Sequence, residues 1–323
     1  MTGERRMVGV DLGGTNLRAA VICSSGAIEQ RQSVPTNADD GPDTVLQRMA
    51  TLVESVAGAA ALDTSAVIGV AAPGPLNPKT GVVHFTPNLP GWRDFPLRDE
   101  LARLTGMHVV VENDANCAVV GEARFGAAKG AQDVIYLGLG TGVGGGAIAN
   151  GKLVSGVNGL GGELGHVCVA VDGPRCTCGG IGCLEAFTAG WAIAREGELV
   201  AATSDGESLR LAAGGNGVTP RTVINAADAG DAAARAILER AGRALGAALG
   251  AFVNIFNPEL IVIGGGLGVG DSHIISAARS SLIDYSFRAQ RLAARIVIAE
   301  LGDDSGLFGA GAMALDADPD LNR

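Results

Sequence analysis

Short apolar runs that end in glycine or in a carboxylate recur along the chain, at residues 7–12, 17–22, 67–70, 109–111, 134–137 and 260–263. The runs are continuous rather than alternating, which is typical of strands that are covered on both faces. Segments with helical spacing separate them, near residues 44–59, 115–124, 232–256 and 274–282. The sequence therefore predicts a mixed α/β fold in which ligands bind beyond the carboxyl ends of the strands.

A strand, a glycine turn and a return strand occur together twice, at residues 7–22 and at residues 134–149. The first turn reads Asp11-Leu12-Gly13-Gly14-Thr15-Asn16, and the second reads Gly140-Thr141-Gly142. Glycines let backbone N–H groups approach phosphate oxygens, and each threonine adds a hydroxyl donor. The first turn alone fits an ordinary β-hairpin equally well, but its recurrence indicates phosphate binding. Neither turn continues as a Walker A loop or as a dinucleotide fingerprint.

The duplicated pattern also predicts the domain organisation, with two related α/β domains that face one cleft. We expect residues 1–114, joined by the C-terminal segment 300–323, to form a small domain. Residues 115–299 are expected to form the larger domain, which includes a cysteine-rich loop. The glycine-bearing stretch at residues 204–219 is polar, and we expect it to be a loop.

Charge and composition narrow the range of partners. The 323 residues include 34 acidic and 24 basic side chains, for a net charge of −10. Nucleic-acid binding needs a basic footprint that this balance excludes, and an anionic membrane surface is disfavoured for the same reason. The opening residues contain no secretory h-region, and the longest apolar helical stretch, residues 245–256, is too short to span a bilayer. The sequence predicts a cytoplasmic protein with no membrane partner.

Four potential metal ligands lie close together in the second half of the chain. Cys176, Cys178 and Cys183 fall within eight residues, and His166 lies ten residues before the first of them. In a reducing compartment such a cluster indicates metal ligation before disulfide bonding, and structural Zn²⁺ sites use Cys₃His sets of this kind. The alternative is three free thiols and a solvated histidine. A metal on one ring nitrogen of His166 would leave the other as a donor for another group.

Carboxylates stand beside these ligands and at two strand ends. Glu163 and Glu185 bracket the cysteine cluster, and a fixed loop would aim both at a polyol, whose hydroxyls donate and accept. The alternative for each is an ordinary surface glutamate.

Asp114 ends a buried strand and opens a helix, where it is suited either to accept a hydroxyl proton as a general base or to cap the helix. Asn113 is suited to form hydrogen bonds with neighbouring hydroxyls. Asp11, on the preceding strand of the first turn, is suited to hold Mg²⁺ through water.

Taken in order along the chain, these motifs resemble the ROK family (repressor, open reading frame, kinase) of sugar kinases and regulators. The matching motifs are Asp11-x-Gly13-Gly14-Thr15-x-x-Arg18, Glu112-Asn113-Asp114, Gly138-x-Gly140-Thr141-Gly142, Gly161-Gly162-Glu163-x-Gly165-His166 and Cys176-x-Cys178-Gly179-x-x-Gly182-Cys183-x-Glu185. The likeness runs from about residue 8 to residue 314. Within the family, the chain is most similar to the ATP-dependent kinases of glucose. The cysteine-rich motif is specific to the family, whereas the first glycine turn alone indicates only the wider actin and hexokinase-like fold.

The resemblance implies two actin-like ATPase domains around a central cleft, and transfer of the ATP γ-phosphoryl group to the 6-hydroxyl of glucose. It makes Asp114 the catalytic base, and it implies sugar-binding roles for Gly74, Asn88, Asn113, Asp114, Glu163, His166 and Glu185. It assigns ATP binding to Asp11, Gly13, Gly14, Thr15, Asn16, Gly140, Thr141, Gly142, Gly265 and Gly266. It assigns structural Zn²⁺ to His166, Cys176, Cys178 and Cys183, and it implies Mg²⁺ and a homodimer or homotetramer.

Four alternatives stay open at this point. The turn Asn88-Leu89-Pro90-Gly91-Trp92 favours glucose by resemblance, but it is equally suited to be an ordered loop with Trp92 in the core. The sugar would differ from glucose if the pocket differs around the sugar 2-position, and the candidates are fructose, mannose, allose and an N-acetylhexosamine. The phosphoryl donor could be polyphosphate in place of ATP, although no basic tract indicates it. A sugar-sensing transcriptional regulator would carry a helix-turn-helix before the first domain, and only about seven residues precede the first predicted strand.

Overall fold

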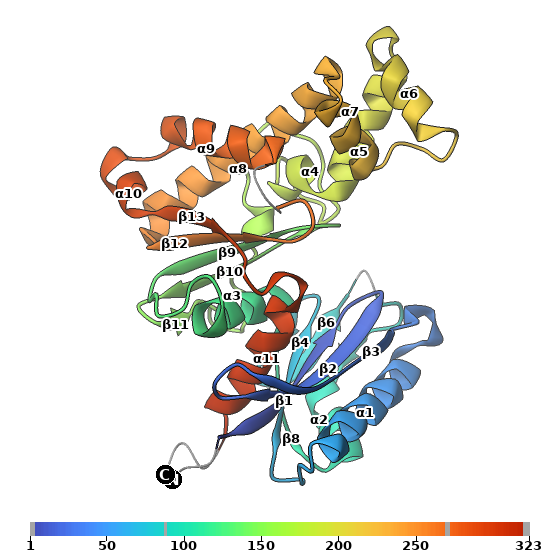
Figure 1. Cartoon of the computed structure of the whole chain (residues 1–323), viewed down its shortest axis with the longest axis vertical. Coiled ribbons are helices and arrows are strands. Elements are labelled where there is room, and N and C mark those ends of the chain that lie inside the picture. The colour runs from blue at the N-terminus through green and yellow to red at the C-terminus, as the bar shows by residue number, and fades with distance from the viewer. Residues whose placement is uncertain (1–3, 87–88, 269–271, 319–323) are drawn as a thin grey trace. The chain divides into compact units, whose positions relative to one another are not determined.

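The computed structural model describes residues 4–86, 89–268 and 272–318 of the chain. Its internal contacts divide the chain into two compact units. Unit 1 comprises residues 1–132, 146–162 and 299–323, and unit 2 comprises residues 133–145 and 163–298. Both units contain helices and strands, which confirms the predicted α/β class (Figure 1).

Unit 1 is built on a five-stranded sheet. The strand order is β3 (Ile28–Pro35), β2 (Asn16–Cys23), β1 (Arg6–Leu12), β4 (Val67–Ala72) and β8 (His108–Asn113). β1 pairs antiparallel with β2, the predicted return strand, and parallel with β4, which in turn pairs parallel with β8. The carboxyl ends of β1, β4 and β8 therefore lie at one edge of the sheet.

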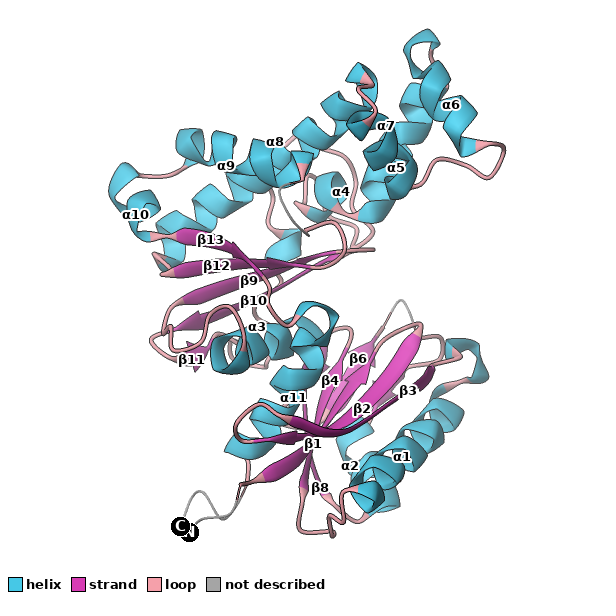
Figure 2. Ribbon diagram, viewed as in Figure 1, coloured by secondary structure: helices cyan, strands magenta, loops and turns pink. Residues whose placement is uncertain are grey.

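Helices cover both faces of this sheet (Figure 2). The helical segments of unit 1 are η1 (Ala38–Asp40), α1 (Pro42–Ala59), α2 (Leu97–Thr105), α3 (Asp114–Phe125), η4 (Gly302–Asp304) and α11 (Ser305–Asp316). Val8 and Val10 are fully buried in the core that α1 and α2 complete. The face that carries Gly9 and Gly69 packs against α11. A Cβ on Gly69 would lie 1.8 Å from the carbonyl oxygen of Ala310, so only glycine allows this close approach.

A small three-stranded sheet completes unit 1. Its order is β5 (Leu76–Asn77), β6 (Val82–Phe85) and β7 (Arg93–Phe95). Trp92, just before β7, is 1% exposed, and its ring centroid lies 4.7 Å from that of Phe95. The alternative that placed the Trp92 indole in the core is therefore confirmed.

The second large sheet begins with the predicted repeat of the strand and glycine turn. Its order is β11 (Lys152–Leu153), β10 (Val143–Ala149), β9 (Val134–Leu139), β12 (Leu260–Gly264) and β13 (Arg295–Ile298). β9, β12 and β13 are parallel, and Gly138 pairs with Gly264 at the carboxyl ends of β9 and β12. These two strand ends therefore present their following turns at the same edge.

Among the described residues, unit 2 has a larger set of helices than unit 1. They are η2 (Leu164–His166), α4 (Glu185–Thr188), α5 (Gly190–Ala201), η3 (Ser204–Gly206), α6 (Glu207–Ala213), α7 (Pro220–Asp228), α8 (Ala232–Phe256), α9 (His273–Tyr285) and α10 (Arg288–Ala293). Gly242, Gly246 and Gly250 repeat at a four-residue spacing, which places them on one face of α8. A Cβ on Gly246 would lie 2.0 Å from Oγ of Ser281, so this glycine face lets α8 and α9 pack closely.

The prediction of a loop at residues 204–219 is wrong for its first part. η3 and α6 occupy residues 204–213, and Leu209 is fully buried. One buried leucine in a short polar stretch is enough to dock a helix, but it creates no hydrophobic period that a sequence pattern can detect.

The division into units and the expected domain boundary differ around α3. The sequence pattern places the boundary at Asp114 and assigns α3 to the second domain, whereas α3 and residues 146–162 group with unit 1. The close packing of α3 against α11 accounts for this grouping. The two helices lie almost 200 residues apart in the chain, so no local pattern shows their contact. The domain limits themselves stay a prediction.

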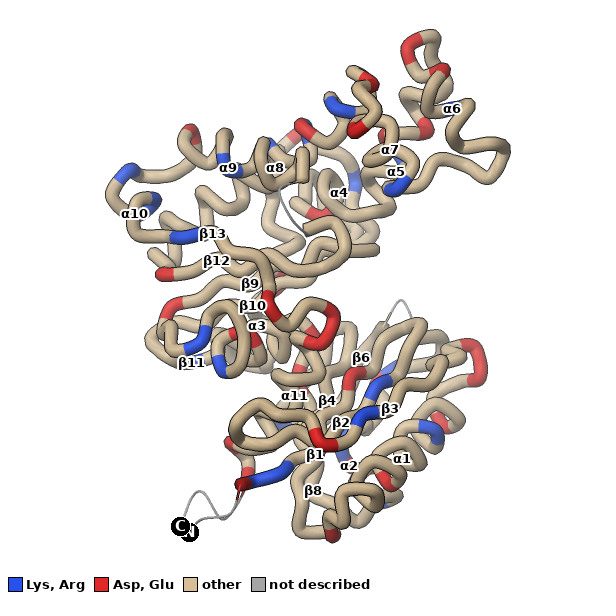
Figure 3. The backbone as a smooth tube through the Cα atoms, in the orientation of Figure 1, with Lys and Arg blue, Asp and Glu red and all other residues tan. Residues whose placement is uncertain are grey.

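Charged residues are spread over the whole chain. Lys and Arg positions occur on elements of both units and are interspersed with Asp and Glu (Figure 3). Among the helices in the described part of the chain, none is both long and apolar enough to cross a membrane.

Candidate active site and metal centre

The carboxyl edge of the unit 1 sheet collects the polar residues that the sequence placed at strand ends. In the strand register, Asp11 of β1 pairs with Ala71 of β4, and Ala72 pairs with Asn113 of β8. Asp114 follows directly as the first residue of α3. Asp11 at the end of β1 and Asn113 and Asp114 at the end of β8 therefore lie at one sheet edge, with β4 between the two strands. This is the edge where ligands bind in sheets of this kind.

Asp114 is exposed at the first turn of α3. The helix cap is Asn113, whose Oδ1 accepts hydrogen bonds from the amides of Ala115 at 2.9 Å and Asn116 at 3.2 Å. The alternative in which Asp114 is the cap is therefore wrong, although its Oδ1 accepts a bond of 2.8 Å from the Ala115 amide. The positive end of the helix dipole favours the ionised form of a carboxylate at this position.

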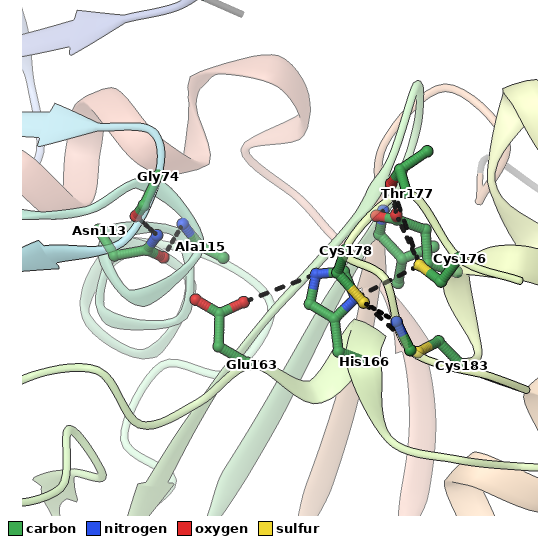
Figure 4. Close-up of polar contacts among 12 residues, drawn as sticks. Gly74, Asn113, Ala115, Glu163, His166, Cys176, Thr177, Cys178 and Cys183 are labelled. Carbon is green, nitrogen blue, oxygen red and sulfur yellow. Dashed lines mark hydrogen bonds and ion pairs between the residues drawn. The ribbon is translucent and has the colours of Figure 1, made fainter. Parts of the chain in front are cut away.

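Asn113 also connects β8 to the loop after β4. Its Nδ2 donates a hydrogen bond of 3.3 Å to the carbonyl oxygen of Gly74 (Figure 4). Gly74 has a φ of 96°, and a Cβ there would lie 2.2 Å from the carbonyl oxygen of Phe85, so this position requires glycine. Two of the predicted sugar-binding residues are thus in contact, while Asn88 lies outside the described residues.

Asp11 lies among other charged groups. Its Oδ2 is 3.8 Å from Nη1 of Arg18. Burial raises the pKa of Asp11 to about 7, and the Arg18 guanidinium opposes this rise. The carboxylates that add to it are those of Asp114, Asp304 and Asp303. A cation beside Asp11 would favour its ionised form, and carboxylate oxygens are suitable partners for the hydration shell of Mg²⁺. The residues present therefore fit the predicted Mg²⁺ role.

The second glycine turn follows β9 in unit 2. The Gly140 amide donates to the carbonyl oxygen of Gly142 at 2.9 Å, and the Gly190 amide donates to the carbonyl oxygen of Gly140 at 2.8 Å. Gly265, at the end of β12, lies against the start of this turn: a Cβ on it would be 2.3 Å from the carbonyl oxygen of Leu139. Two of the segments predicted to bind ATP are therefore side by side.

Glu185 links the second turn to the cysteine cluster. It is 8% exposed, and its Oε2 accepts a hydrogen bond of 3.0 Å from the amide of Val143, the residue after the turn. Its Oε1 accepts from the hydroxyl of Thr177 at 3.0 Å and from Sγ of Cys176 at 3.4 Å. The reading of Glu185 as an ordinary surface residue is therefore wrong, whereas the side chain of Glu163 is 55% exposed.

The four predicted metal ligands converge. The ligand atoms of His166, Cys176, Cys178 and Cys183 all lie within 4.8 Å of one another (Figure 4). Sγ of Cys178 is 3.7 Å from Sγ of Cys183, and Sγ of Cys176 is 3.7 Å from Nδ1 of His166. With Zn–S bonds of about 2.3 Å, a tetrahedral site needs sulfurs about 3.7 Å apart. The geometry fits a tetrahedral Zn²⁺ site.

The protonation of the thiols couples metal binding to pH. Burial raises the pKa of Cys183 to about 12, and burial is also the main cause of the raised pKa of Cys176. Only thiolates ligate Zn²⁺, so binding of the metal must release these protons.

His166 presents its two ring nitrogens to different groups. Nδ1 faces the sulfur of Cys176, while Nε2 lies 4.0 Å from Oε2 of Glu163 (Figure 4). This arrangement is consistent with the prediction that one ring nitrogen binds the metal and the other is a donor for another group. A metal on Nδ1 would fix the ring orientation and place the proton on Nε2.

Comparison with known proteins decides the family. The model of the ROK family matches residues 7–317. The chain belongs to the ROK family. It is 36% identical over 311 residues to a glucokinase of Thermotoga maritima, which covers 95% of this chain and 96% of the relative. It is 31% identical over 315 residues to an N-acetylmannosamine kinase of Shigella flexneri, with coverage of 95% and 98%.

Solved ROK structures match this ROK protein over nearly its whole length. A ROK hexokinase from Thermus thermophilus gives a TM-score of 0.84 at 34% identity and covers 98% of this chain and 100% of its own. A ROK family glucokinase from Streptomyces griseus, in complex with glucose and AMPPNP, gives a TM-score of 0.81 at 33% identity, with coverage of 97% and 100%. The fold is the two-domain actin-like fold of these sugar kinases.

Two buried carboxylates of this ROK protein support the residues above, and neither was given a role from the sequence, although Glu112 belongs to a matched motif. Oε1 of Glu112 accepts hydrogen bonds from the Asn113 amide at 2.8 Å and from Nδ2 of Asn116 at 3.1 Å, which fixes the backbone just before Asp114. Glu122 is fully buried in α3. It accepts hydrogen bonds from the amides of Ala127, Glu300 and Leu301 and from the hydroxyl of Ser305. A carboxylate inside an apolar helical stretch is the only signal that could have indicated Glu122.

Proposed function

We propose that this protein is an ATP-dependent glucokinase, which transfers the γ-phosphoryl group of ATP to the 6-hydroxyl of glucose. The observation that carries the proposal is the position of Asp114. It is an exposed carboxylate at the end of β8, on the same sheet edge as Asp11 and the first glycine turn. The similarity to glucokinases along almost the full chain supports glucose as the substrate.

In this proposal Asp114 is the general base. Phosphoryl transfer needs positioning and charge neutralisation more than covalent work by the protein. Asp114 would accept the proton of the 6-hydroxyl as that oxygen bonds to the γ-phosphorus and the bond to the ADP oxygen breaks. The start of α3 supports this role because its dipole favours the carboxylate form. The Asn113 cap and the bonds to Glu112 hold the backbone at this point.

The phosphates of ATP are assigned to the two glycine turns. Gly13, Gly14, Thr15 and Asn16 supply backbone and hydroxyl donors in unit 1, and Gly140, Thr141 and Gly142 supply them in unit 2. Asp11 would hold Mg²⁺ through water, and when bound the cation supplies neutralisation of phosphate charge. Gly265 and Gly266 are assigned to adenosine, which is consistent with the contact of Gly265 with the start of the second turn.

The sugar hydroxyls are assigned to Gly74, Asn88, Asn113, Asp114, Glu163, His166 and Glu185. His166 offers an Nε2 donor and Glu163 an exposed acceptor. Both oxygens of Glu185 have internal donors, but each carboxylate oxygen has two lone pairs, so Glu185 retains capacity for a sugar hydroxyl. Zn²⁺ on His166, Cys176, Cys178 and Cys183 would be structural and would act only by orienting His166 and its neighbours.

We also propose that the protein is a homodimer or homotetramer, on the basis of its resemblance to other ROK kinases. Light scattering coupled to size-exclusion chromatography would measure the assembly directly. A monomer at micromolar concentration would contradict this part of the proposal without affecting the assignment of the reaction.

A coupled assay over a panel of sugars and donors tests the function. The sugars are glucose, fructose, mannose, allose and N-acetylmannosamine, each with ATP and with polyphosphate. We expect the highest kcat/KM for glucose with ATP. A higher value for N-acetylmannosamine would favour the second candidate, a kinase for an N-acetylhexosamine, which the similarity to N-acetylmannosamine kinases supports. Absence of turnover with every pair would refute the proposed function.

A further inference from the structure

Thr36 contacts the first glycine turn from outside it. The residue follows β3 and is fully buried. Its hydroxyl donates a hydrogen bond of 2.6 Å to the carbonyl oxygen of Gly13, and its amide donates one of 2.8 Å to the carbonyl oxygen of Thr15. A single buried side chain and its own backbone thus hold two carbonyl groups of the turn.

This contact determines the direction of a neighbouring amide. The peptide bond is planar and trans, so the N–H of a residue points opposite to the carbonyl of the residue before it. Holding the Gly13 carbonyl toward Thr36 therefore turns the Gly14 N–H away from Thr36. Within the described residues, the amides of Gly14 and Thr15 have no hydrogen-bond partner. An amide that is fixed in direction and unpaired is suited to bind an anionic oxygen.

A second contact fixes Thr36 itself. Nη1 of Arg48, on α1, donates a hydrogen bond of 2.5 Å to the carbonyl oxygen of Thr36, and its Nη2 donates one of 2.7 Å to Asp40. The hydroxyl and the amide of Thr36 therefore donate to carbonyl groups of the turn, and the carbonyl oxygen of Thr36 accepts from Arg48. The turn is thereby connected through Thr36 to α1, which packs on the sheet.

We propose that Thr36 is a positioning residue for nucleotide binding, which aims the Gly14 amide at a phosphate oxygen by holding the Gly13 carbonyl. The inference rests on the proposed function because it takes the phosphate of ATP as the anion. Thr36 does not touch the ligand. Loss of its hydroxyl would remove the hydrogen bond to the half-buried carbonyl oxygen of Gly13 and free the Gly13–Gly14 peptide to rotate.

The test compares two substitutions at Thr36. Thr36→Val keeps the shape and removes the donor, whereas Thr36→Ser keeps the donor and removes a methyl group. We expect Thr36→Val to raise the KM for ATP about tenfold. The KM for glucose should stay within about twofold of the wild-type value. Thr36→Ser should restore the KM for ATP to within about threefold of that value.

A matched control removes a hydroxyl elsewhere in unit 1. Thr105 donates to the carbonyl oxygen of Leu101 at 2.9 Å at the end of α2, so Thr105→Val loses a comparable bond. We expect its KM for ATP to be unchanged. Should Thr36→Val fail to fold, Arg48→Met loosens Thr36 from the other side, and we expect it to raise the KM for ATP by about threefold.

Calorimetric titration of the same variants with Mg·ATP separates this inference from the proposed function. If the wild-type protein binds Mg·ATP but phosphorylates no sugar, the proposed function fails, and weaker binding by Thr36→Val would still support the role of Thr36. Three results would overturn the role: no binding of Mg·ATP by the wild-type protein, equal affinity of wild type and Thr36→Val, or a defect of Thr36→Ser as large as that of Thr36→Val. An equal rise of both KM values would show a general structural role instead.

Discussion

The two glycine turns of this ROK protein follow strands in the same way, but different groups support them. In unit 1, the turn is held by Thr36, whose hydrogen bonds within the described residues go to Gly13, Thr15 and Arg48. In unit 2, the turn is followed by Val143, whose amide donates to Glu185, and Glu185 also accepts from Cys176 of the cysteine cluster. The two turns that we propose to bind phosphate are therefore held by a threonine hydroxyl in one unit and by a glutamate bonded to the cysteine cluster in the other.

The two units also differ in the exposure of their carboxylates. Asp114 is exposed at a helix start in unit 1, whereas Glu185 is buried in unit 2 and both of its oxygens accept internal hydrogen bonds. An exposed carboxylate can approach a reacting hydroxyl and exchange its proton with solvent. A buried carboxylate whose two oxygens already accept internal hydrogen bonds is better suited to hold neighbouring groups in place. This difference in exposure supports the proposal that Asp114 of unit 1 transfers the proton and that Glu185 of unit 2 orients neighbouring groups.

The largest expected effect tests this division of roles at Asp114. Asp114→Asn should lower kcat on the order of 10²- to 10⁴-fold because the amide cannot accept the hydroxyl proton. Glucose binding, measured by calorimetry, should persist. Glu185→Gln is the comparison variant, and we expect it to affect KM for glucose more than kcat. Near-normal turnover by Asp114→Asn would remove the residue from its catalytic role.

Removal of the metal should affect unit 2 alone. Cys178→Ala should lose bound zinc, measured by elemental analysis, and should weaken glucose affinity about 10- to 100-fold because His166 and Glu185 lose their orientation. Thermal stability should also fall. Thr36→Val should retain the full zinc content. A folded, zinc-free Cys178→Ala protein with ordinary glucose affinity would contradict the predicted link between metal and sugar.

A glycine substitution tests the contact between Glu185 and the second turn. A Cβ on Gly142 would lie 2.8 Å from Oε2 of Glu185, so Gly142→Ala should displace that carboxylate. We expect the KM values for ATP and glucose to rise together, on the order of tenfold. Gly58→Ala, in α1 with no atom within 4 Å of its new Cβ, is the matched control. A rise in the KM for ATP alone would show that Glu185 does not couple the two ligands.

The smallest expected effect concerns the pH dependence of stability in unit 1. Asp11 has a pKa of about 7 in the folded protein against an ordinary value of 3.8, so the folded state retains this proton where the unfolded chain has lost it. The contribution of Asp11 to stability therefore falls as pH rises from about 4 to about 7. Asp11→Asn should be more stable relative to wild type at pH 8 than at pH 5, by about 1–2 kcal/mol.

Urea denaturation without added Mg²⁺ would measure this difference. The relevant quantity is the free energy of unfolding of Asp11→Asn minus that of the wild type, compared at the two pH values. The same difference at both would show that the environment of Asp11 does not shift its pKa in solution.

Short-range spacing predicted much of the fold and of the site. Each glycine turn directly follows a strand in the sequence, and Cys176, Cys178 and Cys183 are only a few residues apart. The local sequence is therefore enough to predict that each of these groups lies together in the fold. The strands at residues 7–12 and 134–137 and the helix at residues 232–256 were predicted for the same reason. Site roles that no observation here tests, such as that of Asn88, stay predictions.

By itself, the sequence determined the α/β class, the two turns, the cluster of His166 with three cysteines and the carboxylate at the start of α3. Only the tertiary structure decided that Thr36 holds the Gly13 carbonyl, that Glu122 bonds the segment before α11, and that α3 belongs with unit 1. The physical reason is the range of the interactions. Periodicity and spacing act between residues a few positions apart, whereas a hydrogen bond from a buried polar group depends on which distant segment packs against it, and that packing exists only in the folded chain.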